Sequence, residues 1–280
     1  MAEIIAIIND KGGVAKTTTT ANLGTALWLL GKKVLLVDTD QQCNLTQIMD
    51  LGSLMAHDDG KRRTLFEWLL DITRIPIYER YEGLDFIPSS RKMSDIEERL
   101  GGIKDKKHLL EQRLDLLRKE YDYILIDCTP GGKNLINSNV LVASDSVIVP
   151  IEASFFSVQG TPNLLHFINE IRQDYKKALP VLGYLLVKYN ERTRLGREVQ
   201  QYYSGNSNIE SMLFKTSIRV CQRCNESPGQ EMTLFEYSPE CSAAADYMRL
   251  AQELSGIKKD SRWNSKKWSK IIEGVRNRQR

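Results

Sequence analysis

A glycine-rich loop that joins an apolar run to a helical segment is the feature that most restricts the folds open to this chain. Residues 4–8 are aliphatic, and the loop that follows reads Asn9-Asp10-Lys11-Gly12-Gly13-Val14-Ala15-Lys16-Thr17-Thr18-Thr19-Thr20. Two adjacent glycines let the backbone turn sharply and aim successive N–H groups inward, and the positive end of the next helix points to the same space. At a strand-to-helix junction, this arrangement predicts a site that binds nucleotide phosphates.

The side chains of this loop have separate roles in holding a nucleotide and Mg²⁺. Lys16 is placed to reach the β- and γ-phosphates, and Thr17 offers a hydroxyl to the metal ion. The spacing departs from the common G-x-x-x-x-G-K-[ST] pattern, because Lys11 fills a variable position and Ala15 replaces the second glycine. We expect a nucleotide to be bound by the run Lys11, Gly12, Gly13, Val14, Ala15, Lys16, Thr17 and Thr18.

Apolar runs alternate with helical periods along the rest of the chain. The expected strands are mostly apolar throughout, as in a sheet covered on both faces, and span residues 3–9, 33–38, 84–88, 123–127, 146–150 and 181–188. The expected helices span residues 16–30, 106–119, 161–176 and 241–254. This order predicts an α/β fold with a doubly wound, mostly parallel sheet, helices on both faces, and ligands at the carboxyl ends of the strands.

The composition is that of an ordinary globular protein. Of 280 residues, 41% are apolar and 27% are charged, which excludes a disordered chain. The longest aliphatic run is residues 4–8, too short to span a bilayer, and nothing resembles a signal peptide. Five scattered cysteines favour reduced thiols over a disulfide framework. We therefore expect a cytoplasmic protein.

Three aspartates lie where two of the expected strands end. Asp127 ends a strand beside the phosphate loop and is our candidate for holding Mg²⁺, through a water molecule. Asp40 is the candidate for orienting the attacking water and for a further contact to the metal site. We expect Asp38 to be either a structural carboxylate or one that contacts the metal ligands without binding the metal itself.

Several segments together resemble the ParA/MinD family of ATPases, and the resemblance covers residues 3 to about 255. The run Lys11–Thr18 is similar to the deviant Walker A loop of that family, and residues 123–130 are similar to its Walker B strand. Residues 38–46 resemble the family's D-x-D-P-Q-x-N-L-T segment, with Gln41 in place of the proline and Cys43 in place of a small residue. That segment indicates ParA rather than MinD.

The resemblance implies an Mg²⁺-dependent ATPase that forms a sandwich dimer around ATP. Lys11 would then cross the dimer interface to the partner's nucleotide, and Lys11, Lys16 and Asp40 would be the catalytic residues. Asn190 opens a second segment similar to ParA, at residues 190–199, and is placed among the nucleotide-binding residues.

The resemblance also implies non-specific DNA binding by the ATP dimer, through basic side chains that meet phosphates. The candidates in the matching segments are Arg192, Arg194, Arg197, Arg219 and Arg223. The alternative is that these are surface arginines paired with Glu191, Glu198 and Glu226.

The C-terminal 23 residues differ in charge from the rest, so we divide the chain into an ATPase domain, residues 1–257, and a basic tail, residues 258–280. The tail holds nine basic and two acidic residues, a net charge of +7, whereas the remainder holds 30 basic and 34 acidic residues, a net charge of −4. Trp268, Ile271, Ile272 and Val275 follow one helix face, with Lys266, Lys267 and Lys270 beside them. This basic amphipathic helix fits a DNA clamp, a membrane-surface anchor, or a helix docked on its own body or a partner.

Cys221 and Cys224 form a C-x-x-C pair, and Cys241 follows. A structural zinc site takes four ligands, and the three histidines are distant in sequence, so we expect free thiols here.

These features together predict a nucleoid-associated ATPase that acts in plasmid or chromosome partition with a ParB-like centromere-binding partner. The first alternative is a MinD-like positioning ATPase that binds a membrane through the tail. The second is a ligase or reductase subunit that uses the same loop, as in dethiobiotin synthetase or the nitrogenase iron protein.

Overall fold

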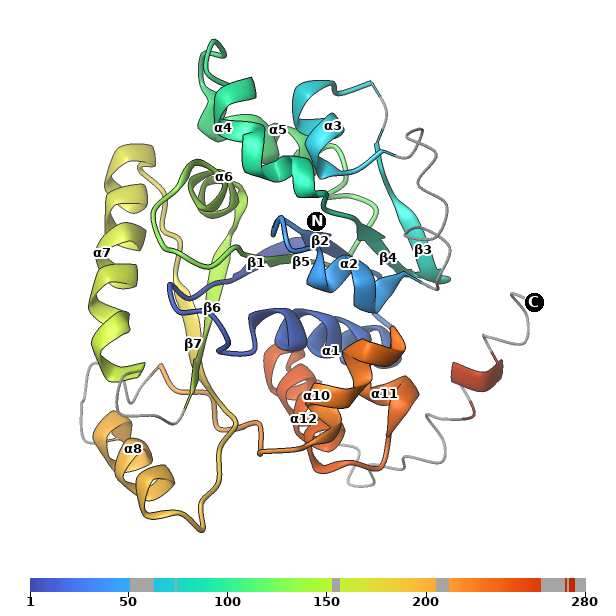
Figure 1. The fold of residues 1–280 in the computed structure, drawn as a ribbon, viewed down its shortest axis with the longest axis vertical. Helices are drawn as coiled ribbons and strands as arrows, with labels where there is room; N and C mark the ends of the chain where they lie inside the picture. Colours follow the sequence, from blue (N-terminus) through green and yellow to red (C-terminus); the bar gives the residue numbers. More distant parts are fainter. Residues whose placement is uncertain are drawn as a thin grey trace.

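The sheet at the centre of the molecule has seven strands in the order β3-β4-β2-β5-β1-β6-β7 (Figure 1). The computed structural model describes residues 1–50, 63–73, 75–152, 157–204, 212–257, 270 and 272–274. The strands are β1 (Glu3–Ile7), β2 (Val34–Asp38), β3 (Tyr78–Tyr81), β4 (Leu84–Ile87), β5 (Tyr123–Asp127), β6 (Ser146–Glu152) and β7 (Val181–Val187). All neighbours pair in parallel except β3 and β4. The predicted doubly wound sheet is therefore confirmed.

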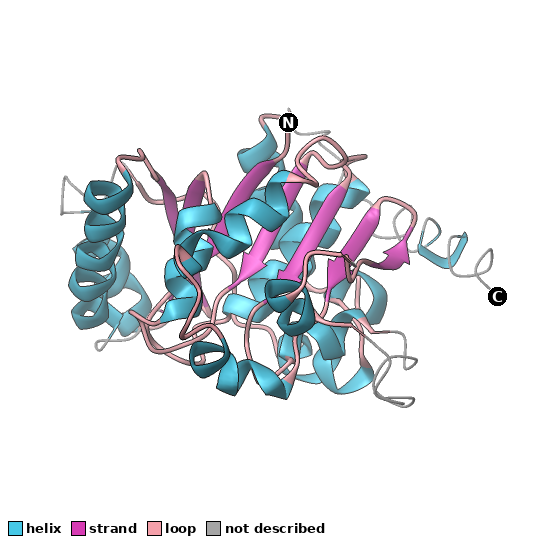
Figure 2. Ribbon diagram, turned by 90° about the horizontal axis from the view of Figure 1, so that it is seen from above, coloured by secondary structure: helices cyan, strands magenta, loops and turns pink. Residues whose placement is uncertain are grey.

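The apolar strands are buried on both faces, as their composition predicted. On β1, Ile4 and Ala6 belong to one core cluster, whereas Ile5 and Ile7 belong to the other. Successive side chains of a strand point to opposite faces of the sheet. An uninterrupted aliphatic strand therefore needs a layer of helices on each side, and Figure 2 shows these two layers.

The helices form these two layers. The face of the sheet to which Ile5 and Ile7 point is covered by α1 (Lys16–Leu29), α2 (Asn44–Met49), α10 (Arg223–Glu226), α11 (Leu234–Tyr237) and α12 (Ser242–Ser255). The opposite layer comprises α3 (Leu65–Leu70), α4 (Ile96–Arg99), α5 (Leu109–Asp115), α6 (Leu135–Ala143) and α7 (Ser157–Tyr175), and α8 (Arg194–Ser204) follows β7. Three short 3₁₀ turns, η1 (Arg91–Asp95), η2 (Lys106–His108) and η3 (Ser227–Gln230), adjoin these helices.

One strand of the sheet, β3, lay outside the predicted elements. Strand β3 carries the charged pair Glu79 and Arg80 and adds an antiparallel edge to the sheet. Arg80 is held by a salt bridge of 2.7 Å to Glu236 of α11, and both side chains are fully buried. An ion pair formed across 156 positions of sequence therefore fixes a polar strand that no apolar pattern predicts.

One residue of the basic tail is buried against the body of the protein. Ile272 is 3% exposed and belongs to the core cluster that contains residues of α1 and α12, while Lys270 and Glu273 are exposed. Within the described ranges, every helix is too short or too polar to span a lipid bilayer.

Candidate functional site

A pocket of about 590 Å³ lies at the carboxyl ends of the central strands, and we call it the nucleotide pocket. Its phosphate side is formed by Gly12, Gly13, Ala15, Lys16, Thr17 and Thr18, with Asp40 beside them. Its far wall comes from the segment 218–225 and from Tyr247 of α12. The loop that the sequence predicts to bind phosphates therefore lines this pocket.

The backbone of the loop is set by two residues in the left-handed region. Gly13 has φ 76°, and Ala15, directly before α1, has φ 60°. A side chain costs free energy in this region, so Ala15 holds a conformation that glycine adopts without strain. A Cβ atom on Gly12 or Gly13 would meet nothing within 4 Å, so the loop faces open space wide enough for a ligand.

Lys16 is held inside the loop by backbone oxygens. Its Nζ donates to the carbonyl of Asn9 at 3.1 Å and to that of Lys11 at 3.0 Å. The side chain is buried, which lowers the pKa of its ammonium, while the nearby charge of Asp127 acts in the opposite direction. A phosphate in the pocket would add a direct charge partner to this ammonium, which here donates to backbone oxygens.

Asp127 and Thr17 meet beneath the loop. The hydroxyl of Thr17 donates to Oδ2 of Asp127 at 2.6 Å, and that of Thr20 lies 3.5 Å from Oδ1. Burial raises the pKa of Asp127 well above its ordinary value, and the charge of Asp38, its register partner on β2, raises it further. A buried carboxylate beside a hydroxyl is a donor set that suits Mg²⁺.

Only part of a metal coordination shell is supplied by these residues. Among the side chains that the structure describes, no group of three or more His, Cys, Asp or Glu residues is placed to hold a metal ion. Mg²⁺ is commonly held by one or two protein ligands together with phosphate oxygens and water. Thr17 and Asp127 beside an open phosphate loop therefore fit Mg²⁺ bound together with a nucleotide.

Asp38 and Asp40 have different surroundings although they are two residues apart. Asp38 is fully buried and accepts from the backbone N–H of Asp40 and from both the N–H and hydroxyl of Thr46. Burial raises its pKa to about 6 despite these hydrogen bonds. Asp40 lines the pocket and accepts from the N–H of Gln42 at 3.0 Å. Asp38 is therefore held by structural hydrogen bonds, whereas Asp40 faces the pocket in which a ligand would bind.

Lys11 does not line the nucleotide pocket of its own chain. Its Nζ lies 3.7 Å from Glu152, and the side chain is 40% exposed. The same carboxylate pairs with Lys188 at 3.3 Å, and Lys188 donates to the carbonyl of Gly13 at 2.8 Å. Lys188 was not among the predicted residues, because the signal that would indicate it, the end of β7 beside the loop, comes from the topology.

Two other predicted nucleotide contacts lie away from the pocket surface. Val14 is 1% exposed and does not line the pocket. Asn190 lies on the neighbouring groove described next, where its Oδ1 accepts from the N–H of Arg192 at 3.1 Å. Their roles in nucleotide binding stay predictions.

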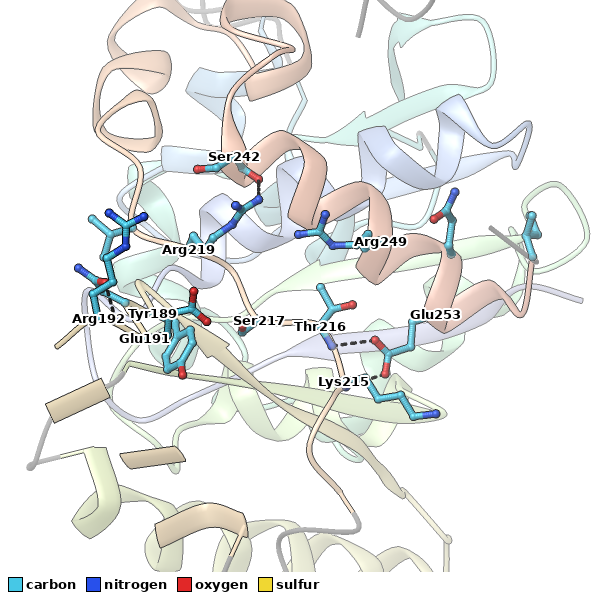
Figure 3. Close-up of a pocket in the computed structure, with 14 residues that line it drawn as sticks. Tyr189, Glu191, Arg192, Lys215, Thr216, Ser217, Arg219, Ser242, Arg249 and Glu253 are labelled. Carbon is cyan, nitrogen blue, oxygen red and sulfur yellow. Dashed lines mark hydrogen bonds between the residues drawn. The ribbon is translucent and has the colours of Figure 1, made fainter. Parts of the chain in front are cut away.

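A second cavity, of about 970 Å³, adjoins the nucleotide pocket, and we call it the arginine groove (Figure 3). Its basic side chains are Arg192, Lys215, Arg219 and Arg249, and Glu191 and Glu253 also line it. Arg219 and Val220 line both cavities, so one short segment forms a common wall. This segment is placed by backbone hydrogen bonds between Tyr189 and its residues 218 and 220.

Asp246 of α12 fixes two arginines of the groove. Its carboxylate is fully buried and accepts from Nε and Nη2 of Arg219, the shortest contact being 2.8 Å, and from Arg249. The two arginine side chains remain 49% and 41% exposed, and in Figure 3 they extend toward one another. Arg249 was not predicted, since its role depends on a helix that folds beside residue 219.

The other predicted DNA contacts are more scattered. Arg194 pairs with Glu198 at 2.7 Å and Arg223 with Glu226 at 2.6 Å, as the alternative interpretation of these arginines expected. Arg197 donates to the backbone carbonyls of residues 191 and 192. Of the three tail lysines, Lys270 is exposed, whereas Lys266 and Lys267 lie outside the described residues.

Comparison with known proteins gives relatives that span nearly the whole chain. Residues 2–181 match the AAA domain family. The sporulation initiation inhibitor protein Soj of Bacillus subtilis is 34% identical over 91% of this chain and 99% of its own length. The chromosome partitioning protein ParA of Caulobacter vibrioides is 30% identical over 92% and 95%.

A solved structure with the same fold holds a nucleotide and a metal ion. It is the cobyrinic acid a,c-diamide synthase of Mycobacterium smegmatis, bound to an ATP analogue and magnesium. It superposes with a TM-score of 0.76 at 27% identity, covering 94% of this chain and 98% of that one. Together with the full-length relatives and the geometry of the phosphate loop, this likeness shows that the chain belongs to the ParA/MinD family of P-loop ATPases.

Proposed function

We propose that this ATPase drives plasmid or chromosome partition by binding non-specific DNA as an ATP dimer. One observation carries the proposal: the nucleotide pocket and the arginine groove share the wall formed by Arg219 and Val220. A nucleotide that binds in the pocket and changes the position of this wall also moves Arg219, which faces the arginine groove where DNA would bind. The relative named for chromosome partitioning, ParA of Caulobacter vibrioides, supports the same assignment.

In the nucleotide pocket, each residue has one task. Lys16 and the N–H groups of residues 12–17 bind the phosphates, while Thr17 and Asp127 hold Mg²⁺. Mg²⁺, when bound, neutralises charge on the transferred phosphoryl group. Asp40 orients the water that attacks it.

Lys11 has a position suited to a task outside its own pocket. Its ammonium is held at the rim by Glu152 and is 40% exposed. In the dimer, Lys11 leaves this carboxylate and reaches the phosphates bound by the partner chain, so that dimerisation and hydrolysis depend on the same side chain. Release from DNA then follows hydrolysis, which a ParB-like protein with a basic N-terminal peptide stimulates.

The alternative of membrane binding requires a free amphipathic tail. Ile272, a member of the apolar stripe of that tail, is buried against the body. This contact removes one apolar side chain from the surface that would enter a lipid headgroup layer, and it favours a docked tail.

The test is binding to random-sequence duplex DNA with ATP and with ADP, for the full chain and for a chain that ends at Ile257. ATP-dependent binding by both chains supports a DNA surface on the body. Loss of binding with the tail would instead make the tail the clamp. Absence of ATP-dependent binding in both chains overturns the partition proposal, and anionic liposomes then become the next ligand to test.

A further inference from the structure

Three thiols gather at or behind the wall of the nucleotide pocket that lies opposite the phosphate loop. Cys221, Cys224 and Cys241 pack against the same apolar core cluster, and the thiol of Cys221 interacts with each of the other two. Cys221 and Cys224 also line the pocket. All five cysteines of the chain are free in this structure.

The backbone already brings the first two thiols together. The N–H of Cys224 donates to the carbonyl of Cys221 at 3.1 Å, which closes a four-residue turn. Such a turn holds its first and fourth Cα atoms within about 7 Å, and a disulfide bridges Cα atoms about 4.4 to 6.8 Å apart. Cys241 has a different contact: its sulfur accepts from the N–H of Ala244 at 3.4 Å and caps α12.

We propose that Cys221 and Cys224 are a reversible thiol–disulfide site through which a low-molecular-weight disulfide such as oxidised glutathione controls nucleotide binding. The Cys221 thiolate attacks one sulfur of the oxidant, breaks its S–S bond and releases one thiol, which takes up the proton of Cys221. Cys224 then attacks Sγ of the mixed disulfide and releases the second thiol, which takes up the proton of Cys224. Two protein thiols are oxidised to one S–S bond, and one disulfide is reduced to two thiols.

The order of the two attacks follows from burial. Burial raises the pKa of Cys224 to about 12 and that of Cys241 to about 11. Both are mostly protonated near neutral pH, so neither is suited to the first, bimolecular attack, whereas the second attack is intramolecular and passes the proton of Cys224 to the departing sulfur. We therefore assign the first attack to Cys221, which lines the nucleotide pocket.

A metal ion fits these thiols less well than a disulfide. Three sulfurs are one fewer than a structural zinc site takes. Across the described part of the chain, no group of three or more His, Cys, Asp or Glu side chains is placed to hold a metal. The turn between Cys221 and Cys224 instead has the chain geometry that a disulfide needs.

The disulfide would change the pocket itself. It draws two sulfurs to a separation of about 2.05 Å, well inside their non-bonded contact distance. The turn that contracts lines the pocket next to Tyr247 and directly follows Arg219 and Val220, the wall shared with the arginine groove. We expect the oxidised protein to bind ATP more weakly, because its far wall is locked in a different position.

The experiment uses the full chain, fully reduced or incubated with oxidised glutathione. Mass spectrometry of proteolytic peptides locates the disulfide, and titration with a fluorescent ATP analogue measures affinity. We expect a Cys221–Cys224 disulfide and a loss of affinity of about threefold or more, reversed by dithiothreitol. A disulfide to Cys241, the absence of an intramolecular disulfide, or unchanged affinity in the oxidised protein overturns the proposal.

Two variants separate this site from general oxidation. Cys221→Ser removes the attacking thiol and should make ATP affinity insensitive to oxidised glutathione. Cys241→Ser is the matched control, because serine keeps a helix-capping acceptor at the start of α12 and leaves the Cys221–Cys224 pair intact. This control should respond to the oxidant as the natural protein does. Because the readout is nucleotide affinity, the result does not depend on whether the protein binds DNA.

Discussion

The nucleotide pocket and the arginine groove lie on either side of the same wall, yet they are built in different ways. The phosphate side of the pocket comes from one continuous loop, residues 9–18, whose shape follows from glycines and a helix start. The groove takes its basic side chains from three separate segments, around residues 192, 215–219 and 249. A continuous site can be found from a local pattern, whereas an assembled site becomes visible only once the chain is folded.

The two sites also differ in how their charges are balanced. In the pocket, buried Lys16 donates to backbone carbonyls and buried Asp127 accepts from hydroxyls. Both side chains are therefore available to interact with a bound ligand. In the groove, buried Asp246 already pairs with two half-exposed arginines. The pocket therefore gains most from ligand binding, and the groove contributes to stability without a ligand. Four predictions test this contrast.

The largest effect is expected from Lys16→Ala. Removing the ammonium that donates to the loop carbonyls of Asn9 and Lys11 lowers ATP hydrolysis by about 10²- to 10³-fold, measured as phosphate release, while thermal unfolding of the ligand-free protein shifts little. Lys104→Ala, which removes an exposed lysine remote from the pocket, is the control and should hydrolyse ATP normally. Similar rates for the two variants would show that Lys16 does not bind phosphate.

Asp246→Ala is the corresponding change at the groove. It leaves two arginines without their shared carboxylate, and we expect a loss of about 2–3 kcal/mol in the free energy of unfolding. Arg249→Ala should cost less than about 1 kcal/mol, because Asp246 keeps Arg219 and the lost arginine is 41% exposed. Urea denaturation of both variants measures the difference, and equal losses would contradict the anchoring role of Asp246.

The buried acid Asp38 should give the pocket a pH dependence. Burial raises its pKa from 3.8 to about 6, so the folded state prefers the protonated form. Its contribution to stability is fully present below about pH 4 and is lost as the pH rises through about 6. Asp38→Asn should therefore gain stability relative to the natural protein, by about 2 kcal/mol between pH 4 and 7.

Urea denaturation at several pH values, without nucleotide, measures this relative gain. Other carboxylates titrate in the same range in both proteins, so only the difference between them reports on Asp38. A difference that stays constant from pH 4 to 7 would show that Asp38 titrates normally.

The smallest effect is expected from Ala15→Gly. Alanine at φ 60° is strained, and glycine relieves the strain while losing more chain entropy, so a net gain of about 0.5 kcal/mol is expected. Ala21→Gly in the interior of α1 is the matched substitution and should cost about 1 kcal/mol. If both changes destabilise the protein equally, the left-handed position of Ala15 carries no strain.

The sequence predicted the central strands and the phosphate loop because their signals are local. Uninterrupted aliphatic runs marked β1, β2 and β5 and ended within two residues of the observed strands. Strand β3 escaped prediction because Arg80 is buried through contacts that the fold creates, with Glu236 and with the backbone carbonyls of Met49 and Glu231. Lys188 and Arg249 escaped for the same reason, since each depends on a partner segment that the topology brings close.

The central claim is that the arginine groove binds DNA when the adjacent pocket holds ATP. The most direct test is the salt dependence of binding to random-sequence duplex DNA, for the natural protein and for Arg219→Ala/Arg249→Ala, with ATP and with ADP. Arg99→Ala/Lys104→Ala, which removes two exposed cations on or next to α4, controls for net charge. We predict ATP-dependent binding whose log–log salt slope falls by about two in the groove variant and is unchanged in the control. An ATP-dependent slope that is the same in all three proteins would contradict the claim and place the DNA elsewhere on the molecule.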